Sequence, residues 1–411
     1  MKVKIKTILQ KTGAVIGWGF NRAVKLFGNL LSLAICSMCP VRKNRVVCWA
    51  YDFKQYSCNP RYLTEYLLTN NPEFDIYWVF RKGVDVSSVD RRIHCVRRRS
   101  WQYFLIMNTA EFLVTNSRTD SWRIYWHKRP KQKYLQLWHG GVALKRVERD
   151  AEAQLGFSYV QKAIRDSRAC DLMISGCHMQ TELLKSKFWY SGDILECGIP
   201  RNDIFFHADL QAQLRERICH LYGLSPDSHI VLYAPTFRRN HSIEPYRIDW
   251  GRVIPHLCTF YGGEEVSILL RLHPNLLGRV DVSSLLNHQA VKDVTKYHDM
   301  QELLCISDML ITDYSSSMFD FTMQMRPCIL YATDVECYDR GYYFDLHDLP
   351  YPLARSEQEL IATIDSFDKC VYVGKVQSFF AEHVGLTESG RACRTLTEWM
   401  VEHSMSCTRE S

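Results

Sequence analysis

Three consecutive serines follow a short apolar run in the last third of the chain. The run Met309 to Thr312 predicts a strand, and the segment 313–317, called the serine loop below, leads from it into a predicted helix. Ser317 and Asp320 are expected to cap that helix. Backbone N–H groups and hydroxyls at the positive end of a helix dipole favour an anion. The loop therefore predicts a phosphate site that includes Ser315 and Ser316.

A histidine at a strand end is the strongest candidate for proton transfer. His139 follows the predicted strand Tyr134 to Trp138 and precedes Gly140 and Gly141, which allow a tight turn and close approach of a substrate. An imidazole in this place can accept a proton from an attacking hydroxyl near neutral pH. The alternative is a structural histidine that bonds the loop backbone. Its position and its glycine neighbours favour a catalytic base.

Two further predicted strand ends carry groups suited to a diphosphate. In Tyr233-Ala-Pro-Thr-Phe-Arg238 the proline ends the strand, Thr236 offers a hydroxyl, and Arg238 offers a bidentate clamp. In Arg271-Leu-His273 the cation and the imidazole are expected on one side of a strand. Each motif alone is weak, but together with the serine loop they predict a diphosphate cradle, with His273 as a second catalytic candidate.

Four other residues are weaker candidates. Glu302 lies about one helix before the serine loop, where a carboxylate suits ribose hydroxyls, although an ordinary exposed helix residue is the alternative. We assign Glu302 and Asp313 to nucleotide binding. Lys145 and Arg201 are assigned to the acceptor, and for Lys145 a solvated helix face is the alternative.

Other classes of site lack their motifs. The chain has no Walker motif, no G-x-G-x-x-G spacing and no Asp-x-Asp pair, so no metal and no cofactor are expected. Cys36 and Cys39 form a Cys-x-x-Cys without partners at zinc-finger distance. Sixteen scattered cysteines favour a reducing cytoplasm over export. The arginines at 91, 92 and 97–99 have few interleaved aromatic residues, which favours lipid headgroups or a polyanionic acceptor over nucleic acid.

The N-terminal segment is basic and amphipathic. No Asp or Glu precedes Asp52, whereas lysines and arginines alternate there with apolar residues. Such a pattern favours a helix on an anionic membrane surface, where each nearby cation contributes roughly 1 kcal/mol. A spanning helix is disfavoured because Arg22, Lys25 and Asn29 interrupt the apolar run. A signal peptide lacks a clear cleavage site, and a helix simply packed on the protein is the remaining alternative.

The elements that must position these residues alternate between short apolar strands and helical patterns. Eleven candidate strands from Val46 onward, separated by helices, indicate parallel sheets buried on both faces. Eleven strands favour two doubly wound α/β domains that face each other, with the ligand at the carboxyl ends of the strands, as in a GT-B fold. The expected division is a membrane-associating segment 1–42, a base-bearing domain 43–205, a donor domain 206–380, and a helix and tail 381–411.

The motifs resemble those of the CDP-glycerol glycerophosphotransferase family, which includes teichoic acid and capsule enzymes. The matching segments are Gln136-Leu-Trp-His-Gly140, Gly198-Ile-Pro-Arg-Asn-Asp-Ile204, Tyr233-Ala-Pro-Thr-Phe-Arg238, Leu270-Arg-Leu-His-Pro274, and a run from Asp299 through Ile311-Thr-Asp-Tyr-Ser-Ser316 to Gly341-Tyr-Tyr-Phe-Asp345. The segment Trp138 to Lys145 is one residue longer than the family's Trp-His-Gly-Thr-Pro-Leu-Lys. This departure bears on the acceptor more than on the reaction type.

The resemblance implies transfer of glycerol phosphate, or a related polyol phosphate, from CDP-glycerol or CDP-ribitol to a lipid- or polymer-linked glycan acceptor. It places the enzyme peripherally at the cytoplasmic face of the cell membrane. By resemblance His139 is the base, and Arg238, His273, Ser315 and Ser316 line the donor diphosphate. A GT-B glycosyltransferase that uses a nucleotide sugar is the alternative function, and a membrane-attached nucleotide-binding scaffold is a third hypothesis.

Overall fold

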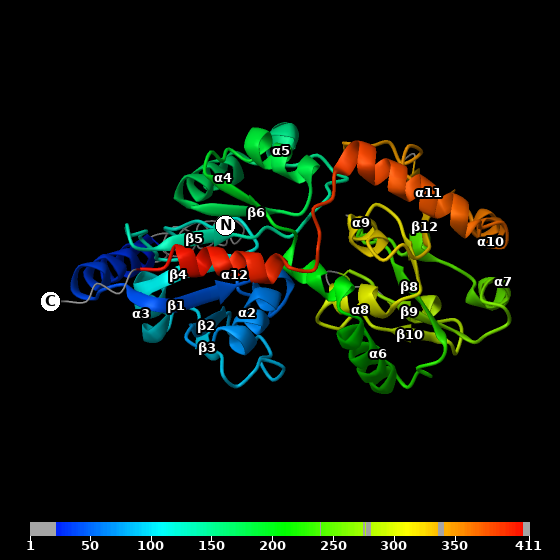
Figure 1. Cartoon of the computed structure of the whole chain (residues 1–411), viewed down its shortest axis with the longest axis horizontal. Helices are drawn as coiled ribbons and strands as arrows, with labels where there is room; N and C mark the ends of the chain where they lie inside the picture. Colours follow the sequence, from blue (N-terminus) through cyan, green and yellow to red (C-terminus); the bar gives the residue numbers. More distant parts are fainter. Residues whose placement is uncertain (1–21, 239, 274–275, 277–280, 336–340, 406–411) are drawn as a thin grey trace, which may run out of the picture.

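The computed structural model describes residues 22–238, 240–273, 276, 281–335 and 341–405, and these form two α/β domains side by side (Figure 1). The first domain has a seven-stranded parallel sheet in the order β3-β2-β1-β4-β5-β6-β7. The second has a six-stranded parallel sheet in the order β10-β9-β8-β11-β12-β13. The prediction of two doubly wound domains is confirmed.

The strands of the first sheet are β1 Arg42–Trp49, β2 Asp75–Phe80, β3 His94–Arg97, β4 Ala110–Thr115, β5 Lys133–Gln136, β6 Leu172–Ser175 and β7 Asp193–Glu196. Those of the second are β8 His229–Ala234, β9 Val266–Leu270, β10 Val291–Asp293, β11 Met309–Thr312, β12 Cys328–Tyr331 and β13 Leu353–Ala354. Neither β3 nor β13 was predicted. The first reads His-Cys-Val-Arg at a sheet edge and the second has two residues, so neither carries a strong apolar signal.

The helices of the first domain are an N-terminal helix over residues 22–38, α2 Cys58–Asn70, α3 Trp101–Thr109, α4 Phe157–Ala169 and α5 His178–Lys187. Those of the second are α6 Ala208–Tyr222, α7 Trp250–Phe260, α8 Met300–Ile306, α9 Ser317–Thr322, α10 Glu357–Asp365 and α11 Lys369–Phe379. The last helix, α12, spans Ala392–Glu402.

Alternation along the strands explains why both faces of each sheet are covered. In β1, Val46 and Cys48 belong to the apolar cluster on one face, whereas Val47 and Trp49 belong to the cluster on the other. Because successive side chains of a strand point to opposite faces, a strand without polar positions must be buried on both. All six residues of β4 are buried, including Glu111, whose carboxylate accepts a hydrogen bond from the Asn44 backbone at 2.6 Å.

Within the residues that the structure describes, the chain crosses between the domains twice. It passes into the second domain through the 3₁₀ turn η2 (Pro200–Phe206) and returns after α11, so that α12 lies along the first domain (Figure 1). Leu396 and Met400 of α12 join the apolar cluster beneath α2. The Glu388 carboxylate on the return segment accepts hydrogen bonds from the Ile199 backbone at 3.0 Å and from Asn202 at 2.9 Å. The two crossings are therefore bonded to each other.

The N-terminal helix packs on the first domain through its small and polar face. The Ser32 hydroxyl donates to the Tyr125 carbonyl at 2.6 Å, and the Asn29 amide donates to the Trp122 carbonyl at 3.2 Å. A Cβ on Gly28 would lie 2.7 Å from the Tyr125 ring, so only glycine allows this approach. The opposite face exposes apolar side chains: Leu26, Phe27, Leu30 and Leu33.

Within the described part of the chain, no helix combines the length and the apolar character that crossing a bilayer requires. The predicted amphipathic segment before residue 22 lies outside the described residues.

Candidate functional site

Hydrogen bonds from side chains to four successive main-chain carbonyls hold the loop that carries His139. Strand β5 ends at Gln136, two residues earlier than predicted, and Trp138 then takes a left-handed backbone with φ of 49°. The Asn59 amide donates to the carbonyls of residues 137 and 138 at 2.8 and 3.0 Å. Arg201 donates to the His139 carbonyl at 2.6 Å, and Gln180 donates to the Gly140 carbonyl at 2.8 Å. The loop is thus fixed before any substrate arrives.

The imidazole of His139 is oriented by the neighbouring strand end. Its Nδ1 lies 2.8 Å from the Asn116 carbonyl, which only accepts hydrogen bonds, so Nδ1 carries the proton and Nε2 keeps its lone pair. The rings of Tyr51 and Trp138 flank it at 5.9 and 4.4 Å between centroids. Since Asn116 follows β4 and Tyr51 follows β1, three adjacent strand ends build this side of the site.

Surrounding protein keeps this imidazole neutral. The ring is exposed toward the cavities it lines, but the protein around it disfavours the charged form and lowers the pKa of His139 below its ordinary value. The nearby Arg201 cation acts in the same direction, while the hydrogen bond to Asn116 opposes both. A neutral imidazole with a proton on Nδ1 is suited to act as a general base through Nε2.

A cavity of about 290 Å³ between the domains brings the expected base and the expected phosphate loop together. His139, Lys145 and Gly141 line it from the first domain, and Thr236, Ser315 and Ser316 line it from the second. β8 and β11, which carry the second-domain residues, are neighbours in the sheet. The loop after His139 also pairs directly with the second domain, because the Arg146 backbone donates to Gly341 at 3.0 Å.

The serine loop is held in place by Asp313. This buried carboxylate accepts hydrogen bonds from the Thr236 backbone at 2.8 Å, from the Thr236 hydroxyl, and from the Tyr314 backbone at 2.6 Å. It is 1% exposed, so it acts on the ends of β8 and β11 rather than facing the cavity. Thr236 is thereby fixed beside the serines.

The helix beyond the serines is capped differently from the prediction. Helix α9 begins at Ser317, after an N-cap residue Ser316 whose side chain makes no capping hydrogen bond. The hydroxyls of Ser315 and Ser317 lie 2.7 Å apart. Asp320 does not cap the helix as expected, because its carboxylate accepts from Arg201 at 2.7 Å.

Arg238 lies beside the serine loop with its guanidinium already engaged. It makes a bidentate pair with Asp334 at 2.6 and 2.9 Å and an ion pair with Asp313 at 2.9 Å. Its side chain also lies over the Tyr314 ring at 4.8 Å. Arg238 is not among the residues that line the cavity. In this structure Arg238 braces the loop from behind.

Arg271 and His273 follow β9, which ends at Leu270, earlier than predicted. Strand alternation therefore does not govern their directions. Arg271 donates to the Tyr297 carbonyl at 2.6 Å. Desolvation, Arg271 and Lys145 together lower the pKa of His273, which favours its neutral form. His273 is not among the residues that line the cavity. β9, β8 and β11 are adjacent strands, as the cradle hypothesis required.

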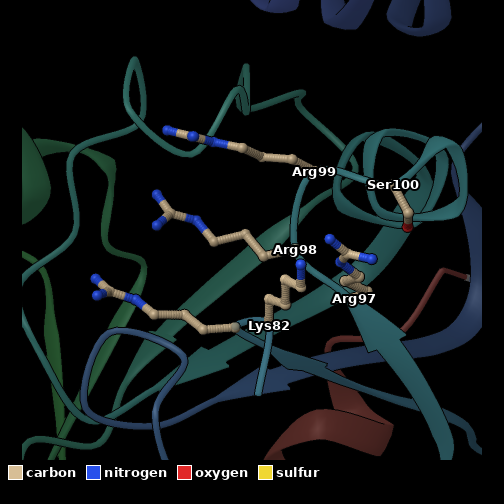
Figure 2. Close-up of a pocket in the computed structure, with 6 residues that line it drawn as sticks. Lys82, Arg97, Arg98, Arg99 and Ser100 are labelled. Carbon is tan, nitrogen blue, oxygen red and sulfur yellow. The ribbon is translucent and has the colours of Figure 1, made fainter. Parts of the chain in front are cut away.

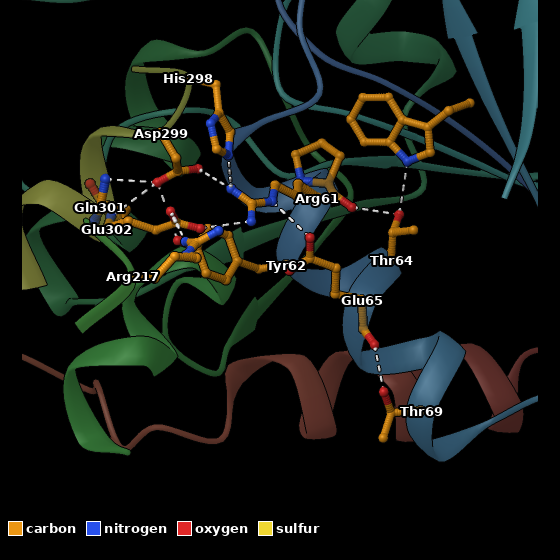
Figure 3. A network of polar contacts seen from close by, with 12 residues as sticks. Arg61, Tyr62, Thr64, Glu65, Thr69, Arg217, His298, Asp299, Gln301 and Glu302 are labelled. Carbon is orange, nitrogen blue, oxygen red and sulfur yellow. Dashed lines mark hydrogen bonds and ion pairs between the residues drawn. The ribbon is translucent and has the colours of Figure 1, made fainter. Parts of the chain in front are cut away.

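Glu302 belongs to an ion network between the domains (Figure 3). Arg61 of α2 donates to Glu302 at 2.7 Å and to Asp299 at 3.1 Å, both at the start of α8. Arg217 and Tyr297 also donate to Glu302, the former at 2.6 Å. The Glu302 side chain is buried, so the exposed-helix alternative is wrong for this residue, and its carboxylate joins the two domains.

Arg201 occupies a comparable position nearer the cavity. Its buried guanidinium donates to the His139 carbonyl and to Asp320. It therefore connects the loop of the expected base to α9, which follows the serine loop. Its partners leave it as a support for both loops, and the cavity lining does not include it.

Several supporting residues were not predicted. Asn116 and Asp334 each follow a strand end, which is the signal that identified His139, and the same rule applied to every strand end would have found them. Asn59 and Gln180 lie within or near helix starts and carry no comparable signal. Over the described ranges, no group of three or more His, Cys, Asp or Glu side chains is arranged to hold a metal ion.

Comparison with known proteins gives one consistent result. The model of the family described as CDP-Glycerol:Poly(glycerophosphate) glycerophosphotransferase matches residues 31–400. The chain is 31% identical to a teichoic acid poly(glycerol phosphate) polymerase of Bacillus subtilis, over 95% of this chain and 53% of that protein. It is 32% identical to a teichoic acid glycerol-phosphate transferase of Staphylococcus aureus, over 86% of this chain and 93% of that protein.

Solved structures agree with the fold. A structure of the wall teichoic acid polymerase TagF, a histidine-to-asparagine variant with CDPG, superposes with a TM-score of 0.78 at 28% identity, covering 93% of this chain and 95% of that one. The two-domain GT-B architecture is therefore shown by similarity as well as by topology. The chain spans about half the length of some of the curated polymerases it matches.

Proposed function

We propose that this chain, which belongs to the CDP-Glycerol:Poly(glycerophosphate) glycerophosphotransferase family, transfers a polyol phosphate from a CDP-linked donor to an acceptor hydroxyl. The observation that carries the proposal is the cavity shared by His139 and the serine loop. A base and an anion-binding loop at one cavity are the two parts that phosphoryl-type transfer requires. The similarity to teichoic acid enzymes supports glycerol phosphate as the transferred group.

The proposed step begins with the acceptor hydroxyl at His139 Nε2. The imidazole takes the hydroxyl proton, the acceptor oxygen forms a bond to the phosphorus that bears the polyol, and the bond from this phosphorus to the bridging oxygen breaks. CMP leaves with that oxygen and its electron pair. Ser315, Ser316 and Thr236 line the space proposed for the phosphoryl oxygens, where serine hydroxyls and backbone N–H groups can stabilise the charge.

The neighbouring cations have different roles in this proposal. Lys145 lines the cavity and is placed to stabilise an anionic donor. His273 has a lowered pKa, so we assign it to the donor as a neutral hydrogen-bonding group. Arg238 and Asp313 position the serine loop, and Arg271 fixes the loop that carries His273. The step uses these groups without a cofactor.

We propose further that the enzyme acts peripherally at the cytoplasmic face of a membrane, on a lipid- or polymer-linked acceptor. The exposed apolar face of the N-terminal helix supports this, together with the exposed Trp122 beside it. Lys25 and Arg123 lie in the same region and suit anionic headgroups. A soluble domain has little other reason to hide the polar face of a helix and expose its apolar one.

The experiment that tests the function is incubation with CDP-glycerol or CDP-ribitol and a membrane extract, followed by mass analysis of the products. Release of CMP with a new phosphodiester is the expected result, and the better donor identifies the polyol. A glycosidic bond formed from a nucleotide sugar would instead establish a glycosyltransferase, since the GT-B fold hosts both reactions. Absence of turnover with every donor would favour a binding protein.

A further inference from the structure

A cavity lined almost wholly by cations lies on the first domain at the end of β3. It has a volume of about 490 Å³ and is called the arginine cavity here. Its lining residues are Arg81, Lys82, Arg97, Arg98, Arg99 and Ser100, with no carboxylate among them. Figure 2 shows the side chains of Arg98 and Arg99 extending in the same direction from the loop after β3. Like charges gathered this closely repel one another unless an anion lies between them.

The structure neutralises little of this charge. Arg81 forms an ion pair with Asp52, but in the ranges that the structure describes no carboxylate pairs with the other four cations. Arg98 and Arg99 instead lie over the rings of Phe53 and Tyr125, at 4.8 and 5.8 Å. Stacking on aromatic faces holds a guanidinium in place without cancelling its charge.

Two buried donors also lack acceptors. The Nε atoms of Arg81 and Arg98 are shielded from solvent, and neither has a hydrogen-bond partner in the described part of the protein. Buried donors are nearly always paired in native structures, so these two guanidinium groups keep hydrogen-bonding capacity that the protein itself does not use. The oxygens of a phosphate group are acceptors of the required kind and charge.

The arginine cavity opens toward His139. A second cavity of about 760 Å³, called the histidine cavity here, shares Arg81, Arg98 and Arg99 with it and reaches His139 and Trp138. Further cations line this second cavity: Lys25, Lys54, Arg123 and Lys162. The two carboxylates that line this cavity already have partners, because Asp52 pairs with Arg81 and Asp120 lies 3.5 Å from Arg123.

His139 therefore stands between two spaces of different character. On one side is the interdomain cavity with the serine loop, and on the other is the histidine cavity with its cations. The base removes a proton from the acceptor hydroxyl while this hydroxyl attacks the donor. The base must therefore lie next to both substrates. Since the serine loop suits the donor diphosphate, the cationic side is left for the acceptor.

We infer that the arginine and histidine cavities form an anion subsite for phosphate groups of the acceptor, with Arg98 and Arg99 as its central contacts. This inference rests on the proposed function and adds the place where the phosphates of the acceptor bind, which is the group of first-domain cations beside His139. A neutral glycan would leave most of these cations without an opposite charge. Lys25, on the N-terminal helix, places one wall of the subsite beside the apolar face of that helix.

The test compares Arg98→Gln/Arg99→Gln with the control Arg168→Gln/Arg394→Gln, which removes the same charge from two exposed arginines outside both cavities. Kinetics are measured with a soluble glycerol phosphate oligomer as acceptor and with an analogue that keeps the hydroxyl but lacks phosphate. The expected result is a KM for the phosphate-bearing acceptor raised at least tenfold, with the KM for the donor and the rate on the phosphate-free analogue unchanged. An equal loss on both acceptors, or a change confined to the donor, would overturn the inference.

A second measurement keeps the inference testable apart from turnover. Calorimetric titration with inorganic pyrophosphate is expected to show binding in the wild type and in a Ser315→Ala/Ser316→Ala variant, and at least tenfold weaker binding in Arg98→Gln/Arg99→Gln. If pyrophosphate binding depends on the serines alone, the subsite is refuted even when transfer occurs. If no donor is turned over but the arginine-dependent binding remains, the proposed function fails and the subsite stands.

Phospholipid headgroups are the other source of phosphate, and vesicles distinguish them. Sedimentation with neutral and anionic vesicles is expected to be the same for Arg98→Gln/Arg99→Gln and its control. Loss of binding to anionic vesicles alone, with an unchanged acceptor KM, would assign these arginines to the membrane surface and overturn the inference.

Discussion

The guanidinium of Arg201 lies 2.7 Å from the Asp320 carboxylate and joins the two domains directly beneath the candidate site. The same guanidinium donates to the His139 carbonyl at 2.6 Å. Arg201, which was expected to contact the acceptor, thus also holds the loop that carries the candidate base.

Replacement of Arg201 by methionine should therefore lower kcat while leaving the acceptor KM nearly unchanged. A small displacement of a base can cost about 10² in rate. It should also lower the free energy of unfolding by about 3–5 kcal/mol, because Asp320 would remain buried without its cation. The double variant Arg201→Met/Asp320→Leu should recover most of that stability but not the rate. A raised acceptor KM with normal kcat would restore the acceptor role.

Replacement of His139 by alanine should abolish most turnover and retain donor binding. Removal of a positioned base costs ~10²–10⁴ in rate. Donor affinity, measured by calorimetry with CDP-glycerol, should change less than threefold because the serine loop is untouched. Full activity in the variant would exclude His139 as the base.

The pH profile of kcat/KM should reflect the lowered pKa of His139. The base works only when neutral, so activity is lost as the pH falls through the folded-state pKa, which lies below the ordinary histidine value of 6.5. The acid limb of the profile is expected below that value. His273 also has a lowered pKa, so the profile is repeated with His273→Asn. A limb that disappears in this variant would transfer the base role to His273.

Glu388 should make the protein less stable at alkaline pH. Burial raises the pKa of Glu388 to about 8, so the folded state holds this proton more tightly than the unfolded state. The contribution of the protonated Glu388 to the free energy of unfolding is complete below the ordinary glutamate pKa. It is lost as the pH rises through about 8. The loss amounts to about 1.4 kcal/mol for each unit between the two pKa values.

Urea unfolding between pH 5 and pH 9 tests the predicted loss of stability at alkaline pH. The pH dependence is expected to flatten in Glu388→Gln and to persist in Glu402→Gln, which alters an exposed carboxylate of α12. Equal slopes in all three proteins would contradict the raised pKa.

Substitution of Phe27 and Leu30 by serine should release the protein from anionic vesicles. These side chains are 70% and 56% exposed, and burial of each in a bilayer interface contributes roughly 1.5–3 kcal/mol. A loss of at least tenfold in vesicle affinity is expected, with unchanged thermal unfolding. Val401→Ser, which removes an exposed valine from α12, is the control. Wild-type vesicle binding in the double variant would refute the membrane role of this face.

The positions of the chemical groups could be predicted because they depend on a local rule. Strand β11 has the bounds expected from its apolar residues, and ligands of parallel sheets collect beyond the carboxyl ends of the strands. This is enough to expect His139 and Ser315 in one cavity, and the structure places them there. The edge strand β3 was not predicted from the sequence because His94 and Arg97 give it a polar pattern.

The pairing of buried charges could not be predicted in the same way. Arg238 pairs with Asp334, 96 positions away, and Arg61 pairs with Glu302, 241 positions away. Many carboxylates are available to each arginine, and the choice depends on how the domains meet. A phosphate clamp and a structural brace have the same local sequence, so only the packed structure distinguishes them.

The bonding of the two crossings at Glu388 limits how the enzyme can open. A single flexible connection would let one half swivel and twist freely relative to the other. Two connections bonded side by side form a hinge. They favour rotation of one domain relative to the other about a single axis that passes through both connections. Each opening then returns the serines to the same face of the imidazole, and a peptide bond cut in one connection leaves the halves tethered by the other.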